Sequence, residues 1–341
     1  MNSTSLQGNR KVLVTGASGF VGRYMCEEML RQGWQVRGAV RSSAQLPDGA
    51  EVVAVGNIDG DTGWMNALRG VDAVIHLAAR VHVMKDTAVD PLAEFIRVNL
   101  YGTSNLAQQA ARAGVRRLVY VSSVKVNGER TAPISPLSPN PSPIEGEGKN
   151  VFFESDEPNP HDPYAISKWR AEQDLLRIAQ ESGLEIVIVR PPLVYGPGVK
   201  GNFISLMAAI DKGVPLPLAG ANNLRSLVYV ENLVDALIVC ATHPGAAGKI
   251  YLVSDGEDIS TPDLLRRLGT ALGRPARLFH CTPALLKLAG QLTGKSDQVE
   301  RLLSSLQVDS GKIRRDLNWA PPYSLQQGLQ VTAEWYRTKH R

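Results

Sequence analysis

Tyr164 and Lys168, a tyrosine and a lysine four residues apart, form the pair best suited to chemistry in this sequence. Pro163 precedes them and marks the first turn of a helix, so both side chains share one helix face. A phenol with a pKa of about 10 is a poor base at neutral pH, but a neighbouring ammonium favours the phenolate. Ser123, at the end of an apolar strand, would hydrogen-bond a substrate oxygen. We expect these three residues to be catalytic, moving a proton alongside a hydride.

A glycine-rich turn near the start of the chain predicts where the hydride carrier binds. Gly16, Gly19 and Gly22 follow the first predicted strand in a GxxGxxG spacing and lead into a helix. Glycines at this spacing permit a tight turn, a close approach to a pyrophosphate and helix-to-strand packing, with the helix N-terminus facing the phosphates. The strand–turn–helix context predicts a nicotinamide dinucleotide site, with further contacts from Ser18, Phe20 and Val21.

The end of the second predicted strand indicates which dinucleotide is bound. An acidic residue there would bind the adenosine ribose and favour NAD, but the sequence has Arg41 followed by two serines. A guanidinium can pair bidentately with a 2′-phosphate. The cofactor expectation is therefore NAD(P), with NADP favoured over NAD.

The rest of the first 190 residues predicts the sheet that positions these groups. Short apolar runs alternate with helical patterns, which is typical of right-handed βαβ units and a parallel sheet covered on both faces. The predicted strands are 11–15, 35–40, 51–55, 73–78, 117–122 and 185–189, and the predicted helices are 20–32, 61–69, 91–113 and 163–182. We expect an α/β Rossmann fold with a doubly wound parallel sheet.

The remainder of the chain predicts a second, smaller lobe. The Rossmann domain should span 10–190, be rejoined by about 226–254, and carry a flexible insertion over 129–150, where prolines alternate with serines. Residues 191–341 should form mainly a helical substrate-binding lobe. Its predicted helices are 202–212, 261–272, 283–292 and 325–338, and the segments 226–240 and 249–253 read as sheet-like.

Composition excludes several classes of protein. The 341 residues carry a net charge of +4 with scattered cations, so no nucleic-acid partner is expected. No apolar stretch is long enough to span a membrane, and the polar segment 1–10 is unlike a signal peptide. Cys26, Cys240 and Cys281 are widely spaced, which indicates neither disulfides nor a metal site. We expect a cytoplasmic protein without a metal.

Taken in order, these motifs resemble the extended short-chain dehydrogenase/reductase family. The resemblance rests on the glycine turn, residues 76–79, 121–128, the Tyr164–Lys168 pair and residues 190–198, and it covers the chain from about Lys11 onward. It implies that Tyr164 is the acid/base, that Lys168 orients the cofactor ribose, and that Asn99 supports the lysine through water. It also implies cofactor contacts from Asn57, Ile58, Leu77, Ala78, Ala79 and Pro191. Enzymes of this family commonly form homodimers through a four-helix bundle.

Among the family's reactions, those on nucleotide sugars are the most similar. Dehydratases need an acid pair where this chain has Val124 and Lys125, so dehydration is disfavoured. The resemblance implies a UDP-sugar substrate. Its expected contacts, besides Ser123, are Asn202, Leu218, Arg225 and Arg301, the arginines serving the diphosphate.

Two kinds of enzyme in this family, a 4-keto reductase and a 4-epimerase, use the same catalytic residues. The runs 76–84, 123–129 and 190–203 look most like the UDP-N-acetyl-quinovosamine 4-dehydrogenase group, 4-keto reductases that act on UDP-linked 6-deoxy-N-acetylhexosamines in surface polysaccharide synthesis. A UDP-hexose 4-epimerase acting on UDP-glucose or UDP-GlcNAc is the alternative, although Leu193 stands where many epimerases have asparagine. A non-catalytic dinucleotide-binding module and a reductase of sterol-like or flavonoid-like ketones also remain open.

Overall fold

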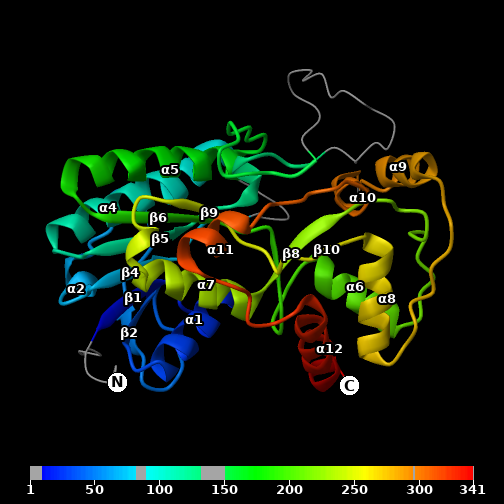
Figure 1. Cartoon of the computed structure of the whole chain (residues 1–341), viewed down its shortest axis with the longest axis horizontal. Helices are drawn as coiled ribbons and strands as arrows, with labels where there is room; N and C mark the ends of the chain where they lie inside the picture. The colour runs from blue at the N-terminus through cyan, green and yellow to red at the C-terminus, as the bar shows by residue number, and fades with distance from the viewer. Residues whose placement is uncertain (1–9, 82–89, 132–149, 295, 341) are drawn as a thin grey trace.

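A seven-stranded parallel sheet forms the centre of the larger part of the molecule (Figure 1). The computed structural model describes residues 10–81, 90–131, 150–294 and 296–340. The strand order is β3-β2-β1-β4-β5-β6-β9. In chain order the strands are β1 (Lys11–Thr15), β2 (Gln35–Val40), β3 (Glu51–Ala54), β4 (Ala73–His76), β5 (Arg117–Val121), β6 (Glu185–Arg190) and β9 (Ile250–Leu252).

Helices cover both faces of this sheet (Figure 1). One face packs against α1 (Phe20–Arg31), α7 (Val230–Thr242) and α11 (Gly311–Leu317), whose apolar side chains share a core with Val12 and Val14. The other packs against α2 (Met65–Leu68), α4 (Gly102–Arg112) and α5 (Pro163–Ser182), which share a core with Leu13. Strands buried on both faces must be apolar throughout, which is why the strand sequences run without alternation. The predicted Rossmann-type α/β fold is confirmed.

The smaller lobe has its own sheet and core. Its strands, in the order β10-β8-β7, are β7 (Leu193–Tyr195), β8 (Arg225–Tyr229) and β10 (Asp258–Ile259). A separate cluster of buried side chains fills this lobe, including Phe203, Leu265 and Leu329. Its helices are α6 (Asn202–Asp211), α8 (Thr261–Leu272), α9 (Pro283–Leu292), α10 (Ser296–Leu303) and α12 (Leu325–His340).

One predicted helix proves to be three segments. Residues 91–113 form α3 (Pro91–Phe95), a π-helical segment η1 (Ile96–Tyr101) and then α4. A π-helix widens the hydrogen-bonded turn by one residue, and such segments are frequent at functional sites. The apolar spacing of the sequence carries no signal that separates this segment from an ordinary helix.

Two further expectations were wrong in part. Residues 226–240 are not sheet-like throughout, because β8 ends at Tyr229 and α7 begins at Val230. A short, continuously apolar run fits a strand or a buried helix equally well, so periodicity alone could not find this boundary. The predicted helix 61–69 is only α2, because a turn at 57–62 occupies its first part.

Two short 3₁₀ segments complete the secondary structure, η2 (Val124–Val126) and η3 (Pro244–Ala246). Among the described residues, no helix is both long and apolar enough to cross a membrane. The predicted insertion 129–150 lies, except for 129–131 and 150, outside the described residues, as do residues 1–9 and 82–89.

Candidate active site

Ser123, Tyr164 and Lys168 meet where β5 ends. Ser123 follows the strand and caps η2, while Tyr164 and Lys168 lie in the first two turns of α5. The Ser123 hydroxyl lies close enough to the Tyr164 phenol to interact with it. The Lys168 ammonium donates to the Val121 carbonyl at 2.7 Å. One proton-carrying phenol thus has a hydroxyl on one side and a buried cation a helical turn away.

Burial controls the charge of this pair. Burial raises the pKa of Tyr164 to about 12, an effect that the Asp162 carboxylate adds to and the Ser123 hydroxyl opposes. Burial lowers the pKa of Lys168 to about 7, against the attraction of Glu172. The protein alone therefore holds the phenol protonated at neutral pH, and an added positive charge beside it would favour the phenolate.

Asn99 joins the catalytic helix to the segment after β4. It lies in the π-helical segment η1, and its amide donates to Ser167 Oγ at 2.9 Å and to the Arg80 carbonyl at 3.0 Å. Its oxygen accepts from the Arg80 amide at 2.8 Å. Asn99 thus fixes the 77–81 segment directly against α5, the helix that carries Lys168.

His76, the last residue of β4, makes two buried side-chain contacts beside the site. Its two ring nitrogens contact Thr15 Oγ1 at 2.6 Å and Thr103 Oγ1 at 2.9 Å. Burial lowers its pKa to about 3, so the ring is neutral at physiological pH. Because His76 is buried, the partly exposed residues Leu77, Ala78 and Ala79 are the ones that can face a ligand here.

The glycine turn has the geometry of a pyrophosphate cradle. Gly16 adopts a φ of +67°, and a Cβ there would lie 2.9 Å from the Ala78 nitrogen. A Cβ on Gly22 would lie 2.1 Å from the Gly16 carbonyl oxygen, so the helix packs directly on the turn. Gly19 caps α1 without a side chain, which leaves the first helical amides of Phe20, Val21 and Gly22 facing outward. Ser18 is exposed at the rim. The residues present therefore fit a dinucleotide.

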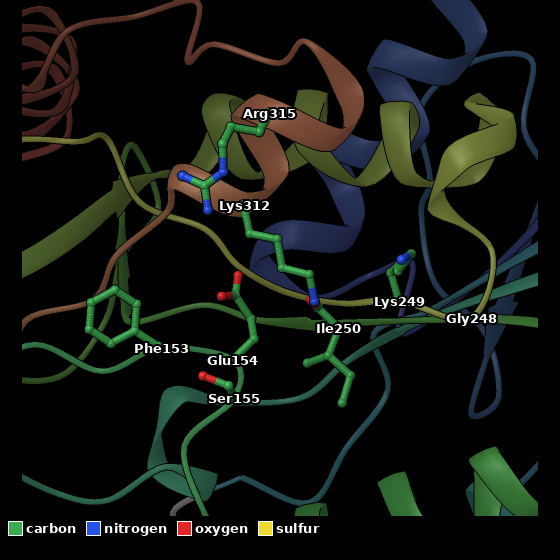
Figure 2. A pocket seen from close by; sticks show the side chains of 8 residues that line it. All are labelled: Phe153, Glu154, Ser155, Gly248, Lys249, Ile250, Lys312 and Arg315. Carbon is green, nitrogen blue, oxygen red and sulfur yellow. The ribbon is translucent and has the colours of Figure 1, made fainter.

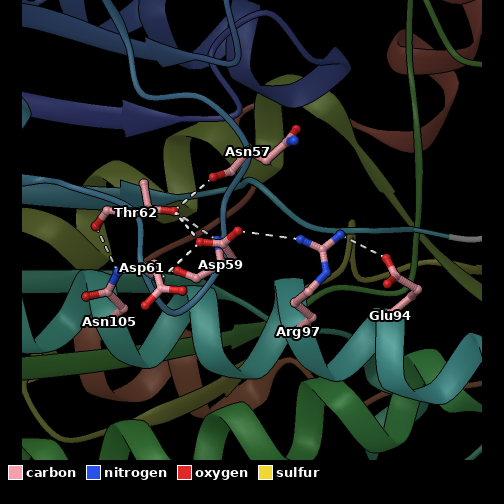
Figure 3. Close-up of polar contacts among 7 residues, drawn as sticks. All are labelled: Asn57, Asp59, Asp61, Thr62, Glu94, Arg97 and Asn105. Atoms are coloured by element: carbon pink, nitrogen blue, oxygen red, sulfur yellow. Dashed lines mark hydrogen bonds and ion pairs between the residues drawn. The ribbon is translucent and has the colours of Figure 1, made fainter.

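Polar contacts hold the loop after β3 against η1 and α4 (Figure 3). Asp59 accepts from the Asp61 amide at 3.1 Å, and its other oxygen lies 3.5 Å from the Arg97 guanidinium. Ile58 packs closely on Gly102 at the start of α4. Asn57, whose carbonyl accepts from Thr62, is exposed. Arg41 is exposed at the end of the neighbouring strand β2, and its carbonyl accepts from Gly56.

The expected diphosphate arginines lie together in the smaller lobe. Arg225, at the start of β8, donates to the backbone carbonyls of Arg301 and Ser304 at 3.0 and 3.1 Å. Burial and the nearby Arg301 charge lower the pKa of Arg225 to about 10. The Arg225 side chain therefore lies beside Arg301, and the two arginines could contribute to one anion site.

The other expected substrate residues are more scattered. Asn202 is exposed as the first residue of α6, whereas Leu218 is buried in the core of the smaller lobe. Leu193 is 48% exposed. It lies two residues after Pro191, whose carbonyl accepts a hydrogen bond from the Val124 amide. Pro191 itself is buried. Leu193 rather than Leu218 therefore presents apolar surface near the end of β6.

Two ion pairs beside the site escaped sequence reasoning. Arg190 binds Glu172 through two hydrogen bonds, the shorter of 2.5 Å, in a fully buried pair. Lys125 pairs with Asp162, the residue that caps α5. The spacing from Lys168 to Glu172 is a helical signal, but the partners Arg190 and Lys125 come from other elements that only the fold brings near.

An open pocket lies elsewhere, along the edge strand β9 (Figure 2). There Glu154 accepts from the Leu252 amide at 2.9 Å, and Lys312 donates to the Ile250 carbonyl at 2.9 Å. None of the expected site residues lines it. Within the parts of the chain that the structure describes, no group of three His, Cys, Asp or Glu side chains could hold a metal ion.

Comparisons with known proteins show which family this chain resembles over most of its length. The family model described as "NAD dependent epimerase/dehydratase family" matches residues 12–254. A UDP-glucose 4-epimerase of Vibrio cholerae is 42% identical over 96% of this chain and 97% of its own length. A 2-alkyl-3-oxoalkanoate reductase of Stenotrophomonas maltophilia is 30% identical over 94% of this chain and 97% of its own length.

A solved structure is similar over the same extent. It is described as MoeE5 in complex with UDP-glucose and NAD, and it is 25% identical with a TM-score of 0.74, covering 98% of this chain and all of its own. The fold, the glycine turn before α1 and the match over 12–254 lead to one conclusion. The chain belongs to the NAD-dependent epimerase/dehydratase family of extended short-chain dehydrogenases/reductases.

Proposed function

We propose that this chain is a UDP-hexose 4-epimerase, which oxidises and then re-reduces C4 of a UDP-linked hexose. The observation that carries the proposal is the convergence of Ser123, Tyr164 and the buried Lys168 at the end of β5, together with the glycine turn before α1. The 42% identity with a UDP-glucose 4-epimerase over nearly the whole of both chains supports the hexose and the reaction.

In this proposal Tyr164 moves the proton. Tyr164 takes the proton of the C4 hydroxyl and later returns it, while Ser123 donates to the same oxygen and keeps it in line. Lys168 lies one helical turn beyond Tyr164, and in its charged form it would lower the cost of the phenolate. When bound, the nicotinamide ring supplies the hydride acceptor and then the donor.

The remaining expected residues would hold the two ligands. The glycine turn with Ser18, Phe20 and Val21 would bind the pyrophosphate, and Asn57, Ile58 and residues 77–79 would line the rest of the dinucleotide cleft. Arg225 and Arg301 would bind the UDP diphosphate, since the Arg225 side chain contacts the backbone of Arg301. NAD accompanies UDP-glucose in the MoeE5 structure, while the exposed Arg41 keeps NADP in the proposal as the alternative cofactor.

A second candidate is the 4-keto reductase of a UDP-linked 6-deoxy-N-acetylhexosamine, serving surface polysaccharide synthesis. The exposed apolar side chain of Leu193 favours it, because leucine cannot hydrogen-bond a sugar hydroxyl but can contact a methyl group. Arg41 favours it too, because a reductase draws on free NADPH.

One experiment separates these reactions. Purified protein is incubated with UDP-glucose and UDP-GlcNAc, and separately with a UDP-4-keto-6-deoxy sugar plus NADH or NADPH. Interconversion of UDP-hexoses without net cofactor consumption supports the epimerase. Stoichiometric oxidation of the reduced cofactor by the keto sugar, without epimerisation, contradicts the epimerase and supports the reductase.

The proposal extends to the organisation of the protein. We expect a cytoplasmic homodimer that pairs through α4 and α5, with residues 10–190 and about 226–254 binding the dinucleotide and most of 191–341 binding the sugar nucleotide. Sedimentation analysis of the purified chain tests the dimer, and a monomer at micromolar concentration would contradict it.

A further inference from the structure

Lys125 lies two residues beyond Ser123 and reaches toward the catalytic helix. Its ammonium pairs with the Asp162 carboxylate and, at 3.1 Å, with Glu129. Asp162 is the N-cap of α5, where its other oxygen accepts from the Ala165 amide at 2.6 Å. One ion pair therefore joins the loop that carries Ser123 to the first turn of the helix that carries Tyr164.

The loop side of this contact is also fixed. The Lys125 amide donates to Ser123 Oγ at 3.2 Å, so the residue that reaches Asp162 also orients the catalytic hydroxyl. The Val124 amide is bonded to Pro191 at the end of β6. Lys125 and Asp162 each keep a little over a quarter of their side-chain surface exposed, so the pair is partly screened by water.

We propose that Lys125 is a positioning residue that acts through Asp162: it holds Ser123 beside Tyr164 and offsets the negative charge that Asp162 places next to the phenol. This inference rests on the proposed acid/base role of Tyr164. It does not depend on which sugar is the substrate.

The charges around Tyr164 show why the offset matters. Asp162 raises the pKa of Tyr164, since a carboxylate two residues away disfavours a phenolate. Arg80 stacks over the Phe95 ring, which meets the Tyr164 ring edge-on at 6.1 Å between centroids. Lys168, Glu172 and His76 are the charged or titratable groups near Tyr164 and its neighbour Tyr120. Lys125 and Glu129 are those near the Asp162 carboxylate. Lys125 is the cation in this group that contacts Asp162 directly.

The test measures the titration of Tyr164 itself. The chain is labelled with carbon-13 at tyrosine Cζ, the Tyr164 signal is assigned with Tyr164→Phe, and NMR spectra are recorded against pH with saturating NAD. Lys125→Met should raise the pKa of Tyr164 by about half a unit, a small value because the pair is partly exposed. Asp162→Asn keeps a good helix cap but removes the charge, so Lys125→Met in that background should produce no further rise.

Two other variants serve as controls. Lys125→Arg retains the cation and should titrate like the natural protein. Arg177→Met removes an exposed cation that pairs with Asp174 and Glu181 farther along α5, and it should also leave the titration unchanged. If Lys125→Met unfolds the protein, Lys125→Gln at the same position provides the neutral variant.

The outcomes are distinct. A Tyr164 pKa that is unchanged in Lys125→Met, or that still rises when Asp162 is already asparagine, overturns the inference. A rise that depends on Asp162, in a protein that turns over no UDP-sugar, leaves the inference standing and contradicts the proposed function instead.

Discussion

The larger and smaller parts of the molecule hold their polar groups in different ways. Around the glycine turn and α5, Lys168, His76 and Asn99 are all buried. Lys168 and His76 bond to residues at the ends of neighbouring strands, whereas Asn99 bonds to α5 and to the segment after β4. In the smaller lobe, Arg225 is only partly buried, and backbone carbonyls more than 75 residues away hold it. The first arrangement suits chemistry that one family shares, and the second suits recognition that differs between members.

Both parts of the molecule expose apolar side chains, and Val52, Met65 and Tyr101 are examples in the larger part. The smaller lobe exposes Leu285, Leu288 and Leu292 along one face of α9, and Leu193 is exposed at its junction with the sheet. Variation in such exposed positions costs little stability. We therefore expect substitutions in the larger part to change turnover or cofactor binding for every substrate, and substitutions in the lobe to change the apparent affinity for particular substrates.

The largest expected effect is at Tyr164. Tyr164→Phe removes the hydroxyl that transfers the proton, so turnover should fall on the order of a hundred- to ten-thousand-fold. Binding of UDP and of NAD, followed by calorimetry, should stay close to that of the natural protein. Near-normal turnover of Tyr164→Phe would contradict the assignment of the catalytic chemistry to the larger part of the molecule.

A smaller effect is expected at the glycine turn. An alanine at Gly22 would place Cβ 2.1 Å from the Gly16 carbonyl and push the turn open. NAD affinity should fall about ten- to a hundredfold, as overpacking of a fixed backbone commonly costs a few kcal/mol. Gly63→Ala is the matched control, since a Cβ there meets no atom within 4 Å. Equal NAD dissociation constants for the two variants would argue against the cradle.

At Arg225 the effect should fall on the substrate. Arg225→Met should raise the Michaelis constant for a UDP-sugar about tenfold, the worth of one charged hydrogen bond, with a lesser change in kcat. Arg266→Met, which removes an exposed arginine paired with Asp263, is the control in the same lobe. A loss in Arg225→Met that is confined to kcat would contradict the division between catalysis in the larger part and substrate recognition in the smaller lobe.

The smallest expected effect is at Arg41. Arg41→Ser should weaken NADPH binding about three- to fivefold, because an exposed guanidinium gains little from one phosphate. NADH binding, measured by the same fluorescence titration, should be unchanged. Equal NADPH affinity in the natural protein and the variant would remove Arg41 from the cofactor site.

Several elements could be predicted to the residue because local signals mark both ends. The helix 163–182 begins with a proline in its first turn and ends at Gly183, which adopts a φ of +74°. The strands 11–15 and 35–40 and the helices 261–272 and 283–292 also have the predicted bounds. Strong motifs and caps act over a few residues, which is the range that a single sequence reveals.

What could not be predicted depends on contacts between distant segments. The π-helical turn at Asn99, the Arg190–Glu172 pair and the Lys125–Asp162 pair each require elements that only the folded chain brings together. Leu218 was expected at the substrate from the family resemblance, but its side chain is buried in the core of the smaller lobe. Backbone hydrogen bonds of Leu216 and Ala219 with residues 277–279 hold this segment in place.

The strand order has a consequence for how the chain matures during synthesis. Strand β9 pairs with β6, yet residues 191–249 separate the end of β6 from the start of β9 along the chain. Helix α11 and Trp319 complete the core on that face later still. While a ribosome translates the intervening lobe, the backbone of β6 presents an unpaired edge, the kind of surface that invites aggregation. Final closure of the dinucleotide half must therefore wait for nearly the whole polypeptide, and chains truncated before Ile250 should be targets for chaperones or proteases.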